Sequence, residues 1–249
     1  MKYNPFSLEN KTVFVTGASS GIGKAIAIEC SKMGATLIIT GRNEERLKET
    51  FNQLEGSNHL QVIADLQKEE QITLLIEQLP LLDGIVHSAG IVTTLPFQFI
   101  TKEKLEEILS INFIKPTLIT QQIIKKKKIN SGASIVWISS ISGTLCSFFG
   151  NSMYSSTKGA INGIVKGMSL DLANKNIRVN SINPGQIETN ILSDGVITKE
   201  QLHEEVKKYP LKRFGKPEEV AYATIYLLSN ASAWITGSHL LIDGGYTLL

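Results

Sequence analysis

The sequence predicts an α/β protein with one doubly wound parallel sheet of about seven strands and helices on both faces. Short runs rich in β-branched residues alternate with longer helical patterns, as repeated βαβ units require. A glycine-rich turn joins the first of these strands to the first helix. No linker, repeat or low-complexity stretch divides the 249 residues, so residues 1–249 are expected to form a single domain.

The expected strands are short, apolar and bounded by turn-forming residues. They are Thr12–Thr16, Thr36–Thr40, Leu60–Ala64, Gly84–His87, Ser134–Ser139, Arg178–Ile182 and Leu240–Ile242. The expected helices are Gly21–Met33, Glu44–Leu54, Lys68–Gln78, Lys102–Lys128, Met153–Ala173 and Pro217–Leu228. Asn43 stands where a helix N-cap is expected, and the glutamates that follow it suit the first turn of a helix.

One irregular stretch, Gln186–Lys216, separates the sixth strand from the last helix. It contains a short amphipathic segment, Lys199–Lys208, between Gly195 and Pro210. Long excursions beyond the carboxyl end of a sheet strand often cover a ligand site. We therefore expect a substrate lid around residues 186–216; a surface helix without such a role is the alternative.

Charge and composition exclude several classes of function. The formal net charge of +2 is evenly spread, which gives no basis for a nucleic-acid or membrane partner. The basic run Lys125–Lys128 ends an expected helix and is interpreted as solvated. Cys30, expected to be a buried thiol, and Cys146 lack metal-ligand spacing and cannot form a disulfide framework. Because of this spacing, no metal site is expected. No apolar run resembles a membrane span or secretory signal, so a cytoplasmic location is expected.

The glycine turn, Thr16–Gly23, reads TGASSGIG. Its glycines allow a tight turn and close approach of the backbone to a ligand, while the following helix N-terminus attracts a pyrophosphate. The spacing differs from the G-x-G-x-x-G pattern, but the strand–turn–helix context is the same. These features predict a Rossmann-like dinucleotide site.

The end of the second strand favours NADP(H) over NAD(H). A carboxylate at this position would bind the ribose 2′-hydroxyl of NAD, but the sequence has Gly41 followed by Arg42. A guanidinium binds phosphate through two hydrogen bonds, so Arg42 is a candidate for the 2′-phosphate. A surface salt bridge is the alternative for Arg42, and NAD(H) stays possible because Glu44 and Glu45 lie nearby.

Tyr154 and Lys158 lie four residues apart at the start of a long helix, so one turn places both on the same face. There the ammonium can lower the pKa of the phenol, and the tyrosine can then exchange a proton near neutral pH. Ser140 precedes the tyrosine by fourteen residues, and Ser139 competes with it because strand alternation sends the two side chains to opposite faces. Alignment to the turn at Gly143 favours Ser140. The alternative is that Tyr154 and Lys158 are an ordinary pair of helix residues, because this spacing often occurs by chance.

In their order and spacing these motifs resemble those of the short-chain dehydrogenases/reductases, from Lys11 to Tyr246. The glycine turn resembles the family's TGxxxGIG loop, and Tyr154–Lys158 its YxxxK motif. One segment departs from the family pattern: His87-Ser88-Ala89-Gly90 replaces NNAG, and we interpret His87 as structural. The resemblance implies a catalytic set of Asn112, Ser140, Tyr154 and Lys158. It implies cofactor contacts from Gly17, Ser19, Ser20, Gly21, Ile22, Gly23, Arg42, Asp65, Leu66, Ser88, Ala89, Gly90, Tyr154, Lys158, Pro184, Gly185, Ile187 and Thr189.

The activity that this resemblance implies is hydride transfer between NADP(H) and a carbonyl or secondary alcohol. A 3-oxoacyl thioester or a similar small ketone is the expected substrate, contacted from Thr93–Phe99, Gly143–Met153 and Gln186–Lys208. Phe148, Phe149 and Met153 fit either an apolar pocket wall or the core. An NAD-dependent alcohol or sterol dehydrogenase is the alternative, followed by a non-catalytic dinucleotide-binding regulator. The resemblance also implies a homo-oligomer, either a dimer or a tetramer.

Overall fold

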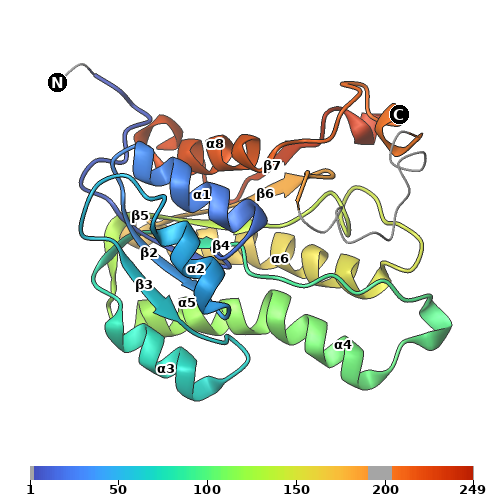
Figure 1. The fold of residues 1–249 in the computed structure, drawn as a ribbon, viewed down its shortest axis with the longest axis horizontal. Helices are drawn as coiled ribbons and strands as arrows, with labels where there is room; N and C mark the ends of the chain where they lie inside the picture. Colours follow the sequence, from blue (N-terminus) through green and yellow to red (C-terminus); the bar gives the residue numbers. More distant parts are fainter. Residues whose placement is uncertain (1–2, 190–203, 249) are drawn as a thin grey trace.

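The computed structural model describes residues 3–189 and 204–248. Its strands form one parallel sheet in the order β3-β2-β1-β4-β5-β6-β7, so the chain winds outward from β1 first in one direction and then in the other (Figure 1). The strands are β1 (Thr12–Thr16), β2 (Thr36–Gly41), β3 (Leu60–Ile63), β4 (Leu82–His87), β5 (Ile129–Ile138), β6 (Arg178–Pro184) and β7 (His239–Ile242). The predicted doubly wound seven-stranded sheet is confirmed.

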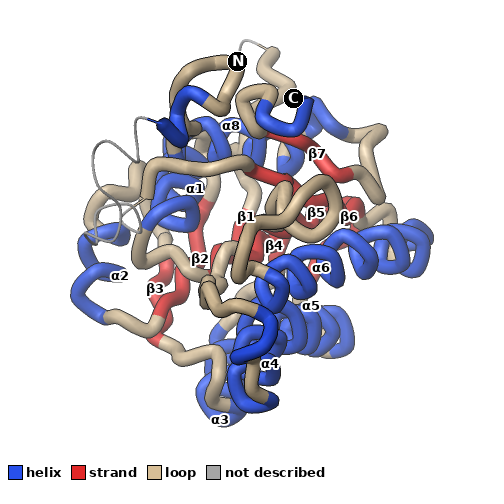
Figure 2. The backbone as a smooth tube through the Cα atoms, turned by 90° about the vertical axis from the view of Figure 1, so that its right-hand side faces the viewer, coloured by secondary structure: helices blue, strands red, loops and turns tan. Residues whose placement is uncertain are grey.

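Helices cover both faces of this sheet (Figures 1 and 2). One face carries α1 (Gly21–Lys32), α2 (Glu44–Phe51) and α8 (Pro217–Leu228). The other face carries α3 (Glu69–Gln78), α5 (Lys115–Lys125) and α6 (Ser152–Asp171), while α4 (Lys102–Leu109) extends beyond the sheet. Strand alternation divides the core accordingly: Val13 and Val15 of β1 pack under α1 and α8, and Phe14 packs on the opposite side.

The single helix predicted for Lys102–Lys128 was wrong in its interior and at its end. A π-helical turn, Ser110–Ile114, separates α4 from α5. Pro116 has no N–H to donate to the carbonyl four residues earlier, so the regular α-helical pattern cannot run through this point. The helix then ends at Lys125, and Lys127 adopts a left-handed conformation with φ of +56°.

The basic run at the end of α5 is not a uniformly solvated tip. Its first three lysines are exposed, but Lys128 is half-buried. The Nζ of Lys128 donates hydrogen bonds to the carbonyls of Glu77 (2.8 Å) and Leu79 (2.6 Å). These carbonyls lie at the C-terminal end of α3, where a cation is favourable. Lys128 therefore joins α3 to the start of β5.

The predicted lid lies partly outside the described residues, which omit 190–203 and with them the first half of the amphipathic segment Lys199–Lys208. The two ends of the stretch meet: Glu188 N–H donates to the Gly215 carbonyl (2.8 Å), and Gly215 N–H donates to the Gln186 carbonyl (3.0 Å). The stretch is thus closed at its base, beside the carboxyl end of β6.

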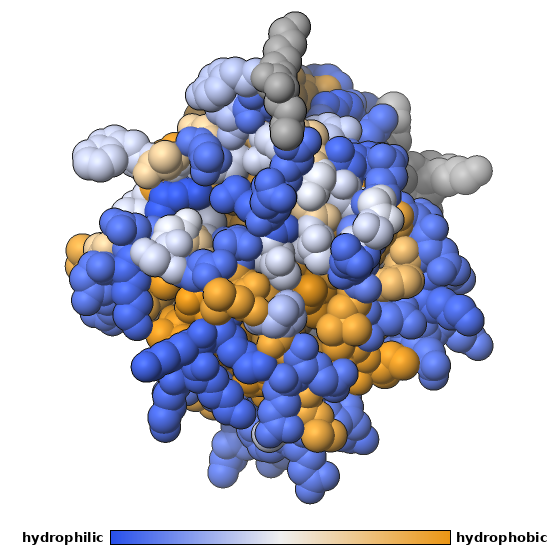
Figure 3. Space-filling view, turned by 90° about the vertical axis from the view of Figure 1, so that its left-hand side faces the viewer, coloured by the Kyte–Doolittle hydropathy of each residue, from blue (hydrophilic) through white to orange (hydrophobic). Residues whose placement is uncertain are grey.

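The amino ends of the strands lie on the left in Figure 1, and this end of the molecule is covered largely by hydrophilic side chains with an apolar band across it (Figure 3). Among residues 3–189 and 204–248, no helix combines the length and apolar character needed to cross a membrane.

Gly143, in the loop after β5, fixes how closely this loop approaches α6. A Cβ at Gly143 would lie 2.1 Å from the Ser155 carbonyl oxygen, and its φ is +96°. We expect Gly143→Ala to lower the free energy of unfolding by about 2–4 kcal/mol, because backbone strain and overpacking add together. Gly132→Ala is the matched control, since Gly132 has φ of +81° but a Cβ there would meet nothing within 4 Å. It should cost only about 1 kcal/mol in urea unfolding; equal losses would contradict the close contact.

Candidate active site

A cleft of about 490 Å³ opens where the strands end, on the side toward which Figure 2 looks. The carboxyl ends of parallel strands, at the point where the winding direction reverses, are where such sheets bind ligands. Every residue predicted to contact a dinucleotide lies along this cleft, and so do three members of the predicted catalytic set, Ser140, Tyr154 and Lys158. The fourth, Asn112, does not line it.

The glycine turn fits tightly against the end of β4. A Cβ on Gly17, whose φ is +70°, would lie 2.7 Å from the Ala89 Cα, and a Cβ on Gly23 would lie 2.3 Å from the Gly17 carbonyl oxygen. The Thr16 hydroxyl accepts hydrogen bonds from the N–H groups of Ser88 and Ala89, each at 3.2 Å. Only glycine therefore fits at positions 17 and 23.

The N-terminus of α1 is left free for an anion. Its first turn contains no acidic residue, and the side chain of Ser20 at the N-cap makes no capping hydrogen bond. By contrast, α2 is capped by the Asn43 side chain and begins with two glutamates. The first N–H groups of a helix lack partners within the helix and carry positive partial charge. The turn and helix therefore fit the pyrophosphate of a dinucleotide.

Two arginines lie at the end of the cleft beside β2. The sequence predicted Arg42 as a cofactor contact but not Arg46 of α2, which also lines the cleft. The position of Arg46, one turn into the helix that follows β2, could have indicated this contact. Both are exposed, and neither forms an ion pair with any residue that the structure describes. Thr50 attaches α2 to the glycine turn, since its hydroxyl donates to the Ala18 carbonyl at 2.9 Å. Glu44 and Glu45 do not line the cleft.

The backbone around Gly41 leaves little room for a larger side chain. A Cβ there would lie 3.1 Å from both Cβ and Oγ of Ser19. Asp65, at the end of β3, turns its carboxylate back on its own loop and accepts from the Gln67 N–H at 3.0 Å. Among the described lining residues, Asp65 has the only carboxylate.

Tyr154, Lys158 and Ser140 meet on the floor of the cleft. Tyr154 and Lys158 lie on one face of α6, with the Lys158 Nζ 5.4 Å from the centroid of the Tyr154 ring. Tyr154 shares a hydrogen bond with the Ser140 side chain. Lys158 is buried, and its Nζ donates to the carbonyl of Ile138 at 2.8 Å. The expected convergence of these three side chains is therefore present.

The pKa of Tyr154 differs in direction from the sequence-based expectation. Burial raises its pKa to about 12, and the hydrogen bond with Ser140 opposes this rise only in part. Burial lowers the pKa of Lys158 to about 8, since an ammonium is poorly stabilised away from water. The loss of hydration thus outweighs the attraction of the ammonium, and the tyrosine is a neutral phenol at pH 7.

Ser139 and Ser140 have separate partners, as their opposite directions on the strand predict. The buried Ser139 hydroxyl donates to the Lys158 carbonyl (3.2 Å) and so holds α6 against β5. The Ser140 hydroxyl accepts from the Ser142 N–H (3.1 Å) and faces Tyr154. Both serines line the cleft, but it is the Ser140 hydroxyl that faces Tyr154.

Asn112 lies buried in the π-helical turn, behind the cleft. Its side-chain Oδ1 accepts from the Ile91 N–H (2.8 Å), while its Nδ2 donates to the Ile91 carbonyl (2.9 Å) and to the Thr157 hydroxyl (3.2 Å). The side chain thus ties the loop after β4 to α6. Its backbone carbonyl receives no N–H from residue 116, which is proline.

His87 is buried and does not line the cleft. Its Nε2 lies 2.6 Å from the hydroxyl of Thr120, and its ring lies on Trp137 with 4.5 Å between centroids. Burial lowers its pKa to about 3, so the ring is neutral at pH 7. These contacts lie within the packed layer between the sheet and α5.

Hydroxyl, amide and aromatic groups line the other end of the cleft, beyond Tyr154, and two of them, Asn151 and Gln186, fall in the segments expected to contact a substrate. These groups belong to Ser142, Asn151, Gln186 and Tyr209. Of the three apolar residues with open assignments, Phe148 lines the cleft, Met153 is buried in the core, and Phe149 is exposed. Tyr209 lies within the predicted lid stretch 186–216, one residue beyond the segment expected to contact the substrate, and no motif indicated its own role.

Comparisons with known proteins agree with this geometry. Residues 17–247 match a family model described as enoyl-(acyl carrier protein) reductase. The 3-oxoacyl-(acyl-carrier-protein) reductase FabG of Rickettsia prowazekii is 34% identical over 242 residues, which cover 97% of this chain and 99% of the relative. The protein of the same name from Aquifex aeolicus is 35% identical, with 96% and 98% covered. A putative short-chain alcohol dehydrogenase from Sinorhizobium meliloti superposes with a TM-score of 0.89 at 29% identity, covering 98% and 99%.

Proposed function

The chain belongs to the short-chain dehydrogenase/reductase family of oxidoreductases, and from its cleft we propose that it reduces ketones with NADPH. The observation that carries the proposal is the meeting of Tyr154, Ser140 and Lys158 on the floor of a cleft whose far end holds two arginines. By analogy with the relatives named 3-oxoacyl-(acyl-carrier-protein) reductase, the proposed substrate is a 3-oxoacyl thioester or a similar small ketone.

The dinucleotide would lie along the cleft from the arginines to Tyr154. The residues proposed to hold it are those predicted from the sequence, with its pyrophosphate at the N-terminus of α1 and its nicotinamide beside Pro184, Gly185 and Thr189. When bound, this cofactor supplies the hydride in one direction and, in its oxidised form, a positive charge. Side chains of the protein would supply the proton and stabilise the developing charge.

Tyr154 is the proposed general acid. With a pKa raised to about 12 its phenol is protonated at pH 7, and a secondary alkoxide is far more basic than a phenolate. Transfer of the phenolic proton to the developing alkoxide is therefore downhill. Ser140, which shares a hydrogen bond with Tyr154, would donate to the same oxygen as its negative charge grows.

Lys158 and Asn112 would return a proton to Tyr154. With a pKa near 8, Lys158 exchanges protons close to neutral pH, and its Nζ lies near the Tyr154 ring. It would also donate to the nicotinamide-ribose hydroxyls. The Asn112 carbonyl, which receives no N–H from Pro116, would hold a water that connects Lys158 with solvent.

NADP(H) is preferred over NAD(H) in this proposal because of the charges near β2. Arg42 and Arg46 line the cleft without ion-pair partners among the described residues. A carboxylate for the 2′-hydroxyl of NAD would have to stand at position 41, where even a Cβ approaches Ser19 to 3.1 Å. Retention of Ser140, Tyr154 and Lys158 likewise disfavours a regulator without catalysis.

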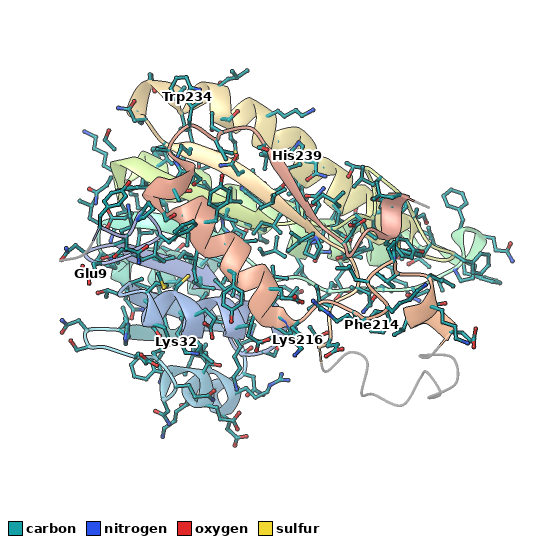
Figure 4. The ribbon with its side chains drawn as sticks, turned by 90° about the horizontal axis from the view of Figure 1, so that it is seen from above. Glu9, Lys32, Phe214, Lys216, Trp234 and His239 are labelled. Carbon is teal, nitrogen blue, oxygen red and sulfur yellow. The ribbon has the colours of Figure 1, made fainter. Side chains whose placement is uncertain are left out.

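A homo-oligomer and a cytoplasmic location are part of the same proposal. Exposed apolar side chains on the outer helices and near the C-terminal strand, such as Leu118, Leu170 and Trp234, suit contact with further copies. Trp234 lies at the outer edge of the molecule in Figure 4, far from Phe214 at the start of α8. Cys30 and Cys146 are both free, which suits a reducing compartment.

Tyr154→Phe should remove the proton donor while leaving the ring in place. We expect NADPH to bind with unchanged affinity and ketone reduction to fall about 10³-fold, within the range that general acid catalysis contributes. NADPH binding is measured by protein fluorescence and turnover by loss of cofactor absorbance. Tyr222→Phe, at an exposed tyrosine of α8, is the control. Wild-type turnover by Tyr154→Phe would refute the proposed role.

Arg42→Gln and Arg46→Gln should each weaken NADPH selectively. Loss of one hydrogen-bonded charge contact should weaken the affinity for NADPH about 10-fold to 100-fold. The affinity for NADH should change by less than about 3-fold, because NADH has no 2′-phosphate. Dissociation constants for both cofactors provide the readout. Lys48→Gln, on α2 but outside the cleft, controls for net charge. Equal losses for NADPH and NADH would contradict the assignment.

A further inference from the structure

Three segments that are distant in the sequence stack their aromatic rings at the substrate end of the cleft. Phe148 precedes α6, Tyr209 lies in the last part of the lid stretch, and Tyr246 belongs to the C-terminal turn. The centroid of the Tyr246 ring lies 4.8 Å from that of Tyr209 and 6.0 Å from that of Phe148, with tilted planes. Phe214 meets Tyr209 edge-on at 5.3 Å. These distances are typical of favourable aromatic pairs.

Tyr246 stands behind this stack, since Phe148 and Tyr209 line the cleft and Tyr246 does not. The C-terminal turn that carries Tyr246 is itself held in place. The carboxylate of Asp243 accepts from the N–H groups of Gly245 (2.9 Å) and Thr247 (2.8 Å), and Leu211 N–H donates to the Gly244 carbonyl (3.3 Å). The last residues of the chain thus set the position of the two rings that face the substrate.

Tyr209 has a second contact that joins the ring stack to the end of β6. Its hydroxyl accepts a hydrogen bond from the Gln186 N–H at 3.2 Å, directly after the Pro184–Gly185 pair. Only 4% of Tyr209 is exposed, and its ring packs on Tyr246 and Phe214 while its hydroxyl contacts Gln186. The hydroxyl and the ring of Tyr209 can therefore be tested separately.

Charge is confined to the other part of the cleft. The charged residues among the described lining are Arg42, Arg46, Asp65 and Lys158. The first three follow β2 and β3, and the Lys158 ammonium is hydrogen-bonded to the Ile138 carbonyl.

Near the ring stack the described lining residues are neutral, whereas Glu205, Asp243 and Lys208, which act electrostatically on Tyr209 and Tyr246, do not line the cleft. An anionic group of a substrate would therefore lose its hydration there without gaining a partner among the described lining residues.

The mouth of the cleft continues this apolar surface. Val92 lines the cleft and is 50% exposed, and Phe149, next to Phe148, is 89% exposed. The two loops that carry them are joined, since Leu95 N–H donates to the Gly150 carbonyl at 2.8 Å. Large apolar side chains left in water beside a cleft are typical of a binding surface.

We propose that Phe148 and Tyr209, supported by Tyr246, form a specificity wall that selects carbonyl compounds with an uncharged, apolar group beside the carbonyl. Tyr246 is a positioning residue that acts through the other two rings. The inference rests on the proposed reduction: the carbonyl carbon gains a hydride from NADPH, its oxygen gains the Tyr154 proton, and the products are NADP⁺ and a secondary alcohol.

The experiment compares two probes that share one ketone, ethyl acetoacetate and the acetoacetate anion. The wild-type protein should reduce the ester with a kcat/KM at least about 10-fold above that of the anion. Phe148→Ser and Tyr246→Ala should each lower this ratio about 3-fold to 10-fold, because water entering beside the wall hydrates the carboxylate.

Two control variants separate the wall from general destabilisation. Tyr209→Phe keeps the ring but loses the hydroxyl, so the ester-to-anion ratio should stay unchanged while KM for NADPH rises. Tyr222→Ala, on the surface of α8, should change neither value. A ratio near one in the wild type, or an unchanged ratio in both Phe148→Ser and Tyr246→Ala, overturns the proposed wall.

Calorimetric binding of both probes to the NADPH complex is measured in parallel. Tighter binding of the ester supports the wall whether or not turnover occurs, and equal affinities overturn it. Binding of NADPH and ester without any oxidation of NADPH contradicts carbonyl reduction instead. The two proposals therefore fail by different results.

Discussion

The burial of Lys158 beside Tyr154 is the constraint on which the rest of the site depends. An ammonium and a phenol have been brought out of water together, and the loss of hydration controls both of their pKa values. The hydrogen bond from the Lys158 ammonium to the Ile138 carbonyl compensates in part for the lost hydration of the lysine. This arrangement requires α6 to lie close against the end of β5, which the contact between Gly143 and Ser155 and the hydrogen bond from Ser139 together secure.

The sheet then supplies a cleft with chemically different ends. Positive charge and a free helix N-terminus gather where β1 and β2 finish, while neutral and aromatic groups gather where β5 and β6 finish. A ligand with phosphates at one end and a planar ring at the other fits this division. Beyond it, Phe148 and Tyr209 line the space proposed for a neutral, apolar substrate, and Tyr246 of the C-terminal turn packs behind both rings.

Local patterns were sufficient for the order of elements, the glycine turn and the pairing of Tyr154 with Lys158, because each depends on spacing within a few residues. They failed where distant parts of the chain decide the outcome. The π-helical turn depends on Pro116 together with the contacts of the Asn112 side chain to Ile91. The direction of the Tyr154 pKa depends on burial, and the position of Tyr209 depends on Tyr246 and Phe214, none of which spacing reveals.

We expect Tyr154 to be a weak acid in the protein alone and a stronger one only when a positive charge joins Lys158 beside it. Ultraviolet titration of the phenol, taken as the difference between wild type and Tyr154→Phe, measures this directly. We expect a pKa of about 12 without a dinucleotide and a clearly lower value with NADP⁺ bound. A pKa already near 7 in the protein alone, or no change on addition of NADP⁺, would contradict this expectation.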